Sequence, residues 1–581
     1  MIGVAGGAAD PRRQAFGAGA LARALAEPSG LLRIALAGVV LVAGGLALLL
    51  AWQRAYQVDE VESIHAAYAL ASGKLIYRDF WQGHHPLLYL LLAPILPVDE
   101  PVVAFRVARL LCFALFVASV GLAGWLTRRL GGVAALAMAL LLLHSTFVER
   151  GLEVRPDTLM TPLVLLALLV GTFESRPTRW RFLVQALLLG FAFVATQKAA
   201  IASFAFGCFW LACAMRDRRP SLVVLPCAVW LIPWLALLGG LAIQGGLEDY
   251  ARFNLFHPSE SVQGQGAAAA VRFSALDPLR VEGARNLAFC VAAIAAGIAV
   301  LVGLIRRGST DRQRALWPTA ALAAVWIAGL FVMPFPYPYS QAAGIPPIAV
   351  VIATVVGQEI GRHRPTLRRA RVVALVSGVL VLAAMATSLP RIVGERAKDN
   401  ARQLRVLERV DALSDASSPV LDLAGLYFRP DAYPVYVMTG AHYARYRRGD
   451  YPPIAPWLRE HGLDLFVVNY RMRWLDGEDR AFLQENFVRV EPNLFLSGRD
   501  LDGMAADETR RFEVTRAGDY RFDGEGELLV DGRAFRSGRL ERGVYALSAP
   551  GGIGRGRLVS ARAPERPSAP IADVPLFYGF D

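Results

Sequence analysis

Long apolar runs are the feature that most restricts the fold of this 581-residue chain. Each run holds about 17–25 residues, the length that a helix needs to cross roughly 30 Å of hydrocarbon. Hydrophobic residues make up 55% of the chain, more than in a typical soluble domain. We therefore predict a polytopic α-helical membrane protein. Its transmembrane helices, about eleven in number, are expected at 31–52, 101–126, 131–148, 157–174, 182–198, 199–215, 221–243, 284–305, 316–333, 342–360 and 371–389.

The loops between these runs fall into two alternating sets. One set is rich in arginine and poor in acid: 128–129, 176–181, 216–219, 306–314 and 362–371. The other set holds the carboxylates, histidines and aromatics: 53–100, 149–157, 244–283 and 334–341. The positive-inside bias then predicts a multi-pass inner-membrane protein with a cytoplasmic N-terminus and an extracytoplasmic segment after residue 390. The same bias explains the net charge of +12. Nucleic-acid binding is not expected, because no basic stripe carries interleaved aromatics.

Composition changes divide the chain into four expected regions. Residues 1–30, rich in Gly, Ala and Arg, are predicted to be a mobile cytoplasmic segment, and 31–390 form the transmembrane domain. An amphipathic helix at 391–412 opens an extracytoplasmic α/β domain that extends to residue 500. Short alternating runs with Gly turns predict a β-rich, sandwich-like domain at 501–581. The five cysteines all lie in apolar runs, so no disulfide or zinc site is expected.

The first long loop carries the strongest chemical signal. Its segment 56–97 is too polar to cross a bilayer and too rich in Trp, Tyr and Leu to be freely solvated. Asp59 and Glu60 lie side by side about seven residues after the first apolar run. Adjacent carboxylates suit a general base with a partner that orients the acceptor or binds a divalent metal. A solvated surface pair is the alternative. His84 and His85 follow in the same loop as further candidates.

Charged residues also gather where the runs 131–148 and 157–174 meet: Glu149, Arg150, Glu153, Arg155 and Asp157. Ionisable groups at such a depth are costly, so they usually pair with one another or line a site. Lys198, one of only three lysines, lies at the outer end of the run 182–198. It could hold a phosphate whose lipid tail lies in the bilayer, or it could reach to the interface as long cations commonly do.

Two weaker candidates are aromatic or histidine residues in the outer loops. Tyr339 lies in the Pro/Tyr turn PFPYPYSQ, and His257 lies in YARFNLFHP. Aromatic faces stack on sugar rings, but aromatics at a bilayer surface commonly form the interfacial belt. No phosphate-binding or dinucleotide glycine motif is present, so nucleotide-driven chemistry is not supported.

Taken together, these pieces resemble a known family. DEVESIHAAYALASGKLIYRDFWQGHHPLLYLLLAPI, at 59–95, resembles the first loop of GT-C membrane glycosyltransferases, in the branch of protein O-mannosyltransferases and the aminoarabinose transferase of lipid A. Weaker matches are VRPD at 154–157, QK at 197–198 and the Pro/Tyr turn. The resemblance covers about 40–390, and the C-terminal 190 or so residues match no family that we can name.

The resemblance implies an inverting transfer of a sugar from a polyprenyl-phosphate donor on the outer membrane face. Asp59 would be the base that deprotonates the acceptor hydroxyl, with Glu60 assisting. Lys198, and with it Arg155 or His85, would hold the donor phosphate. Glu153, Asp157, His84, Tyr339 and His257 are then candidates for substrate contacts. The acceptor, whether glycan, lipid or protein, and any need for a metal are left open.

Two other classes of protein compete with this interpretation. A lipid or sugar transporter or flippase is expected to show broken helices in two related halves and charges near mid-membrane, whereas here the charges gather toward one face. A membrane scaffold that only displays its C-terminal region would leave the acidic first loop and Lys198 without a role.

Overall fold

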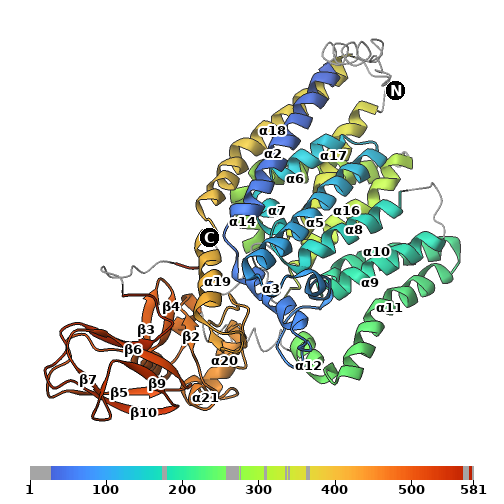
Figure 1. Cartoon of the computed structure of the whole chain (residues 1–581). Coiled ribbons are helices and arrows are strands. Elements are labelled where there is room, and N and C mark those ends of the chain that lie inside the picture. The colour runs from blue at the N-terminus through green and yellow to red at the C-terminus, as the bar shows by residue number, and fades with distance from the viewer. Residues whose placement is uncertain are drawn as a thin grey trace, which may run out of the picture.

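The computed structural model describes residues 28–172, 179–256, 274, 276–305, 311–333, 337, 340–361, 367–566 and 575–578. A large helical bundle is joined to a C-terminal part that contains the strands (Figure 1). The C-terminal part lies at one end of the bundle, next to α3 and α19.

Helices form where the apolar runs predict them. Their bounds are α2 Pro28–Gln53, α5 Pro101–Arg129, α6 Ala134–Leu142, α7 Ser145–Gly151, α8 Pro156–Val170, α9 Arg179–Ala195, α10 Ala199–Asp217, α11 Ser221–Gln244, α14 Asp277–Arg285, α15 Leu287–Ile305, α16 Asp311–Gly329, α17 Ile345–Gly361 and α18 Leu367–Gly394. By length and composition, 5 described helices can cross a membrane, or up to 7 if each bent helix pair is one span, and three shorter helices are also apolar. The prediction of about eleven spans therefore stays a prediction.

Two predicted spans are not continuous helices. The run 131–148 is divided into α6 and α7, which meet at 75°, and α14 and α15 meet at 112° around the start of the run 284–305. Polar side chains stabilise both breaks. His144 caps α7 by accepting a bond from the backbone N–H of Phe147, and Asn286 Oδ1 accepts from the backbone N–H of Ser145 at 3.0 Å. The helical ends freed by a break need such partners, and the apolar composition of the runs does not reveal them.

Described residues from the two sets of loops meet at different ends of the bundle. At one end α2 and α18 finish together, where the N–H of Ala55 donates to the carbonyl of Lys398 at 2.7 Å. At the other end Arg129 donates to the carbonyl of Thr172 at 3.4 Å. There Gly132 lies so close to α17 that an added Cβ would be 2.5 Å from the Cα of Thr354. These contacts agree with the alternation predicted from the arginines, and the cytoplasmic side remains a prediction.

The first loop is folded and largely buried. It contains α3 (Val58–Ala71) and α4 (Leu87–Leu92), followed after α11 by the short α12 (Leu247–Ala251) on the same end. Helix α19 (Ala401–Leu413) turns Leu404, Leu407 and Val410 into the same apolar core as Ile64 of α3. The predicted amphipathic helix is therefore present, and its apolar face packs against the first loop.

The C-terminal part holds two sheets and three short helices. The helices are α20 Gly440–Arg448, α21 Ile454–His461 and α22 Gly477–Asn486. The strands are β1 Val420–Leu421, β2 Leu465–Val467, β3 Phe487–Glu491, β4 Leu494–Asp500, β5 Thr509–Val514, β6 Gly518–Gly524, β7 Leu528–Val530, β8 Arg533–Phe535, β9 Ser537–Leu540, β10 Gly543–Ser548 and β11 Gly556–Ser560.

These strands form a sandwich with one continuous larger sheet. The larger sheet has the order β1-β2-β4-β11-β6-β9, with β3 also on β4, and the smaller one has the order β5-β10-β7-β8. Side chains from both sheets share one core, for example Phe512 of β5 and Phe522 of β6. Since β4 pairs with both β2 and β11, the larger sheet continues across residue 500, where the sequence predicts a domain boundary.

Candidate active site

The two adjacent carboxylates at the start of α3 have different surroundings. Glu60 is fully buried, and Arg109 of α5 donates to both of its carboxylate oxygens, from Nε at 3.0 Å and Nη2 at 2.6 Å. The backbone N–H groups of Gln57 (2.9 Å) and Val154 (3.1 Å) also donate to Glu60, and Arg54 lies 4.0 Å away. Glu60 thus caps α3 and joins it to α5 and to the turn before α8. This geometry favours a positioning role over contact with substrate.

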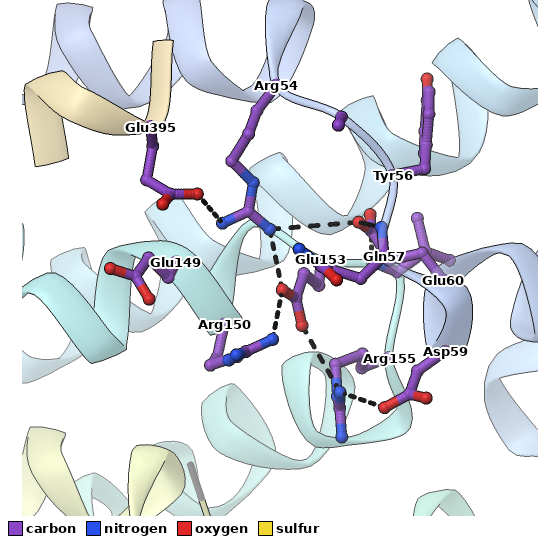
Figure 2. Close-up of polar contacts among 12 residues, drawn as sticks. Arg54, Tyr56, Gln57, Asp59, Glu60, Glu149, Arg150, Glu153, Arg155 and Glu395 are labelled. Atoms are coloured by element: carbon purple, nitrogen blue, oxygen red, sulfur yellow. Dashed lines mark hydrogen bonds and ion pairs between the residues drawn. The ribbon is translucent and has the colours of Figure 1, made fainter. Parts of the chain in front are cut away.

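Asp59, one residue earlier, faces the other way. Its side chain is 29% exposed, and Arg155 Nη1 donates to its Oδ2 at 2.6 Å (Figure 2). Burial by itself raises the pKa of Asp59, but the charges of Arg155, Arg471 and Arg150 outweigh it and hold that pKa below its usual value. Asp59 is therefore an ionised carboxylate, partly open to solvent, at the end of the bundle that carries the acidic loops.

Glu153 is the centre of a buried charged network between these groups (Figure 2). It is fully buried and accepts from Arg54 and Arg150 at 2.8 Å each, while Arg155 lies 3.5 Å away. Arg155 thus connects Glu153 to Asp59. With three cations around it, Glu153 is placed to orient these arginines, and its burial does not support the substrate contact that the sequence suggested.

Lys198 and Asp157 form a second ion pair near the first. Lys198 Nζ donates to Asp157 Oδ2 at 2.6 Å, and both side chains are partly exposed. His84 is within electrostatic reach of both pairs. Burial, with the charge of Lys198, lowers the pKa of His84 to about 4, and Asp157, Arg155 and Asp59 also act on it. The structure therefore brings together Asp59, Arg155, Asp157, Lys198 and His84, which are distant in sequence.

His85 does not join this group. One of its ring nitrogens, Nδ1, contacts the carbonyl oxygen of Phe193, and the other, Nε2, lies 2.9 Å from the hydroxyl of Tyr250. Burial lowers its pKa to about 4, so the ring is neutral and both nitrogens are engaged. This geometry does not favour a phosphate contact by His85, since the ring joins the first loop to α9 and α12. The role expected for His85 stays a prediction. Tyr339 and His257 lie outside the described residues.

Sequence reasoning missed two groups beside Asp59. Glu62, one helical turn along α3, is buried, and burial together with the charge of Asp59 raises its pKa to about 8. A carboxyl with a displaced pKa is a common sign of a functional site. Arg471, from the C-terminal part, is also buried and lowers the pKa of both carboxyls. Nothing in the sequence places residue 471 near residue 59.

Two further arginines of the site lie in or near predicted apolar spans. Arg109 lies within the predicted span 101–126 and Arg54 directly follows the predicted span 31–52. An arginine inside an apolar span nearly always has a buried partner, and here the partners are Glu60 and Glu153.

The arrangement combines an ionised carboxylate with separate cations at one open site. Such a set can accept a proton from a hydroxyl and stabilise negative charge that develops on a phosphate. Among the described residues, no group of three or more His, Cys, Asp or Glu side chains is arranged to hold a metal ion.

Comparison with known proteins identifies the fold. No protein-family model matches the sequence, and no curated protein matches it. The crystal structure of ArnT from Cupriavidus metallidurans bound to undecaprenyl phosphate is similar, with a TM-score of 0.51 and 12% identity over 76% of this chain and 93% of that chain. The similarity confirms the predicted GT-C fold.

Two weaker similarities were also found. The oligosaccharyltransferase AglB from Archaeoglobus fulgidus, in complex with an inhibitory peptide and a dolichol-phosphate, gives a TM-score of 0.48 at 11% identity, over 80% of this chain and 74% of that chain. The arabinosyltransferase EmbB from Mycobacterium smegmatis gives 0.38 at 12% identity, over 90% and 62%.

Proposed function

We propose that this protein is a membrane glycosyltransferase that moves a sugar from a polyprenyl-phosphate donor to an acceptor hydroxyl, with inversion, on the extracytoplasmic face of the inner membrane. The observation that supports this most is Asp59, an ionised and partly exposed carboxylate paired with Arg155. The ion pair of Lys198 with Asp157 lies within electrostatic reach of Arg155. The GT-C fold, shared with a protein solved with undecaprenyl phosphate, is consistent with a lipid-linked donor.

The chemistry assigns one task to each side of the site. The acceptor oxygen attacks the anomeric carbon while its proton passes to Asp59. The bond from that carbon to the phosphate oxygen breaks, and polyprenyl phosphate leaves with one more negative charge. Fixed cations near that oxygen stabilise the growing charge, and we assign this task to Lys198, whose side chain is partly exposed.

Arg155 links the two tasks. In the structure it neutralises Asp59, which keeps the carboxylate ionised but makes it a weaker base. A donor phosphate at Lys198 would also attract Arg155. We propose that Arg155 turns toward the phosphate when the donor binds, so that Asp59 becomes a stronger base only after the donor is bound.

The function is tested by mass spectrometry of surface glycans, glycolipids and glycoproteins from cells with and without this protein. We expect one class of sugar-modified acceptor to disappear without the protein and to return with the wild-type chain. Its mass difference would identify the sugar and the acceptor together. Identical spectra from both strains, under conditions in which the protein is produced, would contradict the proposed transfer.

The donor side is tested by Lys198→Ala. We expect the affinity for undecaprenyl phosphate to fall about tenfold, the loss of one charge-assisted contact of roughly 1.4 kcal/mol. Folding should be little affected, since the Lys198 side chain is 24% exposed. The measurement is lipid binding to the purified protein in detergent.

Lys74→Ala is the matched control. Lys74 also forms one ion pair, with Asp431 at 2.7 Å, and its side chain is 34% exposed. It should lose a similar amount of thermal stability and keep its affinity for the lipid. Equal lipid binding by both variants would remove Lys198 from the donor site.

A further inference from the structure

A charged pocket lies beside the proposed catalytic group, at the same end of the bundle. It has a volume of about 270 Å³ and is lined by the ends of α2, α7, α14 and α18 and by the segment that follows α18. Its basic lining residues are Arg54, Arg150, Arg285, Arg391 and Lys398. We call this cavity the arginine pocket.

The acids in the arginine pocket do not balance its bases. Glu149, Glu153 and Glu395 are the acidic lining residues. Each of them is in an ion pair: Glu149 with Arg285 at 3.2 Å, Glu153 with Arg54 at 2.8 Å, and Glu395 with Lys398 at 3.0 Å. Five basic and three acidic side chains leave a formal excess of two positive charges. A phosphate group carries about −1.5 to −2 at neutral pH, so the pocket matches it in charge.

The pocket is connected to the proposed base through two residues. Glu153 lines the pocket and accepts from Arg54 and Arg150. On its other side lies Arg155, which bonds to Asp59 (Figure 2). An anion in the pocket competes with Glu153 for Arg54 and Arg150. Glu153 then attracts Arg155 more strongly, which weakens the hold of Arg155 on Asp59.

The donor phosphate has a different place in the proposed function. Lys198, Asp157 and His84 are not among the residues that line the arginine pocket. In an inverting displacement the attacking oxygen and the departing phosphate oxygen lie on opposite faces of the anomeric carbon. The acceptor therefore needs its own binding surface next to Asp59, separate from the cations that hold the donor.

We propose that the arginine pocket binds a phosphate or carboxylate group of the acceptor substrate, and so selects anionic acceptors. The proposal rests on the proposed glycosyltransferase function, since it names the class of the second substrate. The shared chemistry is an anionic oxygen cluster held by arginines, which bind such groups with paired hydrogen bonds.

The test compares three full-length proteins in detergent: wild type, Arg391→Gln/Lys398→Gln, and Arg396→Gln/Arg405→Gln. The first double variant removes two positive charges from the pocket. The second removes two from exposed residues nearby that do not line it. The probe is inorganic phosphate at constant ionic strength, added after the donor site has been saturated with undecaprenyl phosphate. The measurement is the thermal unfolding midpoint against phosphate concentration.

We expect phosphate to raise the midpoint of the wild type and of Arg396→Gln/Arg405→Gln with the same half-maximal concentration. The pocket variant should need about five times more phosphate, as expected from removing two partly exposed charges. All three proteins should bind undecaprenyl phosphate within twofold of one another. The same phosphate response in both double variants would overturn the proposal.

A loss of undecaprenyl phosphate binding in the pocket variant alone would overturn it as well, because the pocket would then belong to the donor. The proposed function is judged separately. A wild-type protein that binds no undecaprenyl phosphate would count against glycosyl transfer from this donor, whereas the phosphate comparison among the three proteins would still decide the question of the pocket.

Discussion

Asp59→Asn is expected to reduce sugar transfer by about 10²–10⁴-fold, the usual contribution of a general base. The amide has the same shape as the carboxylate but cannot accept the proton of the acceptor hydroxyl. Folding should survive, because Asp59 is 29% exposed and Arg155 keeps Glu153 as a partner. The measurement is transfer from a polyprenyl-phosphate sugar by the purified variant, together with its thermal unfolding midpoint.

Asp79→Asn provides the matched control for this experiment. Asp79 lies in the same loop, pairs with Arg78 at 2.7 Å and is 30% exposed. The Asp79→Asn variant therefore loses an equivalent ion pair away from the site. It should keep nearly full activity. A fully active Asp59→Asn enzyme would contradict the assignment, and so would equal losses in both variants.

The pH dependence gives a second readout for the same residue. The arginines around Asp59 hold its pKa below its usual value, so Asp59 loses its proton at lower pH than a free aspartate does. The wild-type rate should therefore not fall between pH 7 and pH 5 through protonation of this group. A fall in the transfer rate on acidification, with its midpoint near pH 6 and no matching fall in protein stability, would show that another group is the base.

Arg109→Met is expected to destabilise the protein by about 3–5 kcal/mol, the usual cost of leaving one partner of a buried ion pair alone. Arg109 is 2% exposed and donates to both oxygens of the fully buried Glu60. Its guanidinium also lies over the ring of Tyr56, 3.7 Å from the ring centroid. The measurement is the loss of folded protein with temperature, followed in detergent.

Two further variants separate the ion pair from packing. Arg106→Met, one turn earlier on α5, removes a partly exposed arginine that lies over Trp52, and it should cost far less. Glu60→Gln/Arg109→Met should recover part of the stability lost by Arg109→Met, because no charge is then left buried. Equal losses for Arg106→Met and Arg109→Met would show that the Glu60 pair does not stabilise the start of α3.

Much of the bundle followed from local patterns. The apolar runs predicted the helices because each helix must satisfy its own backbone in lipid. The alternation of arginine and acid predicted which loops share an end of the bundle, and contacts such as that between residues 55 and 398 agree. After the bundle, the predicted amphipathic helix at 391–412 overlaps α19 at Ala401–Leu413.

The breaks in the helices and the continuity of the larger sheet did not follow from those patterns. The turn between α6 and α7 depends on Asn286, which lies 141 residues after Ser145. The pairing of β4 with β11 joins two regions that composition separates. In both cases a partner distant in sequence decides the structure. The periodicity of a segment indicates which of its residues are buried, but not which part of the chain covers them.

The candidate site shows the same division. The sequence by itself determined which chemical groups this protein has at the acidic end of its bundle. Asp59, Glu60, Glu153, Arg155, Asp157 and Lys198 all lie in or beside the loops that carry its carboxylates. Only the tertiary structure decided their roles. It buried Glu60 on Arg109, left Asp59 partly open on Arg155, and brought Arg471 within reach. The physical reason is that the charge state and exposure of a carboxylate depend on neighbours that the fold supplies, and adjacent residues of one helix face different neighbours.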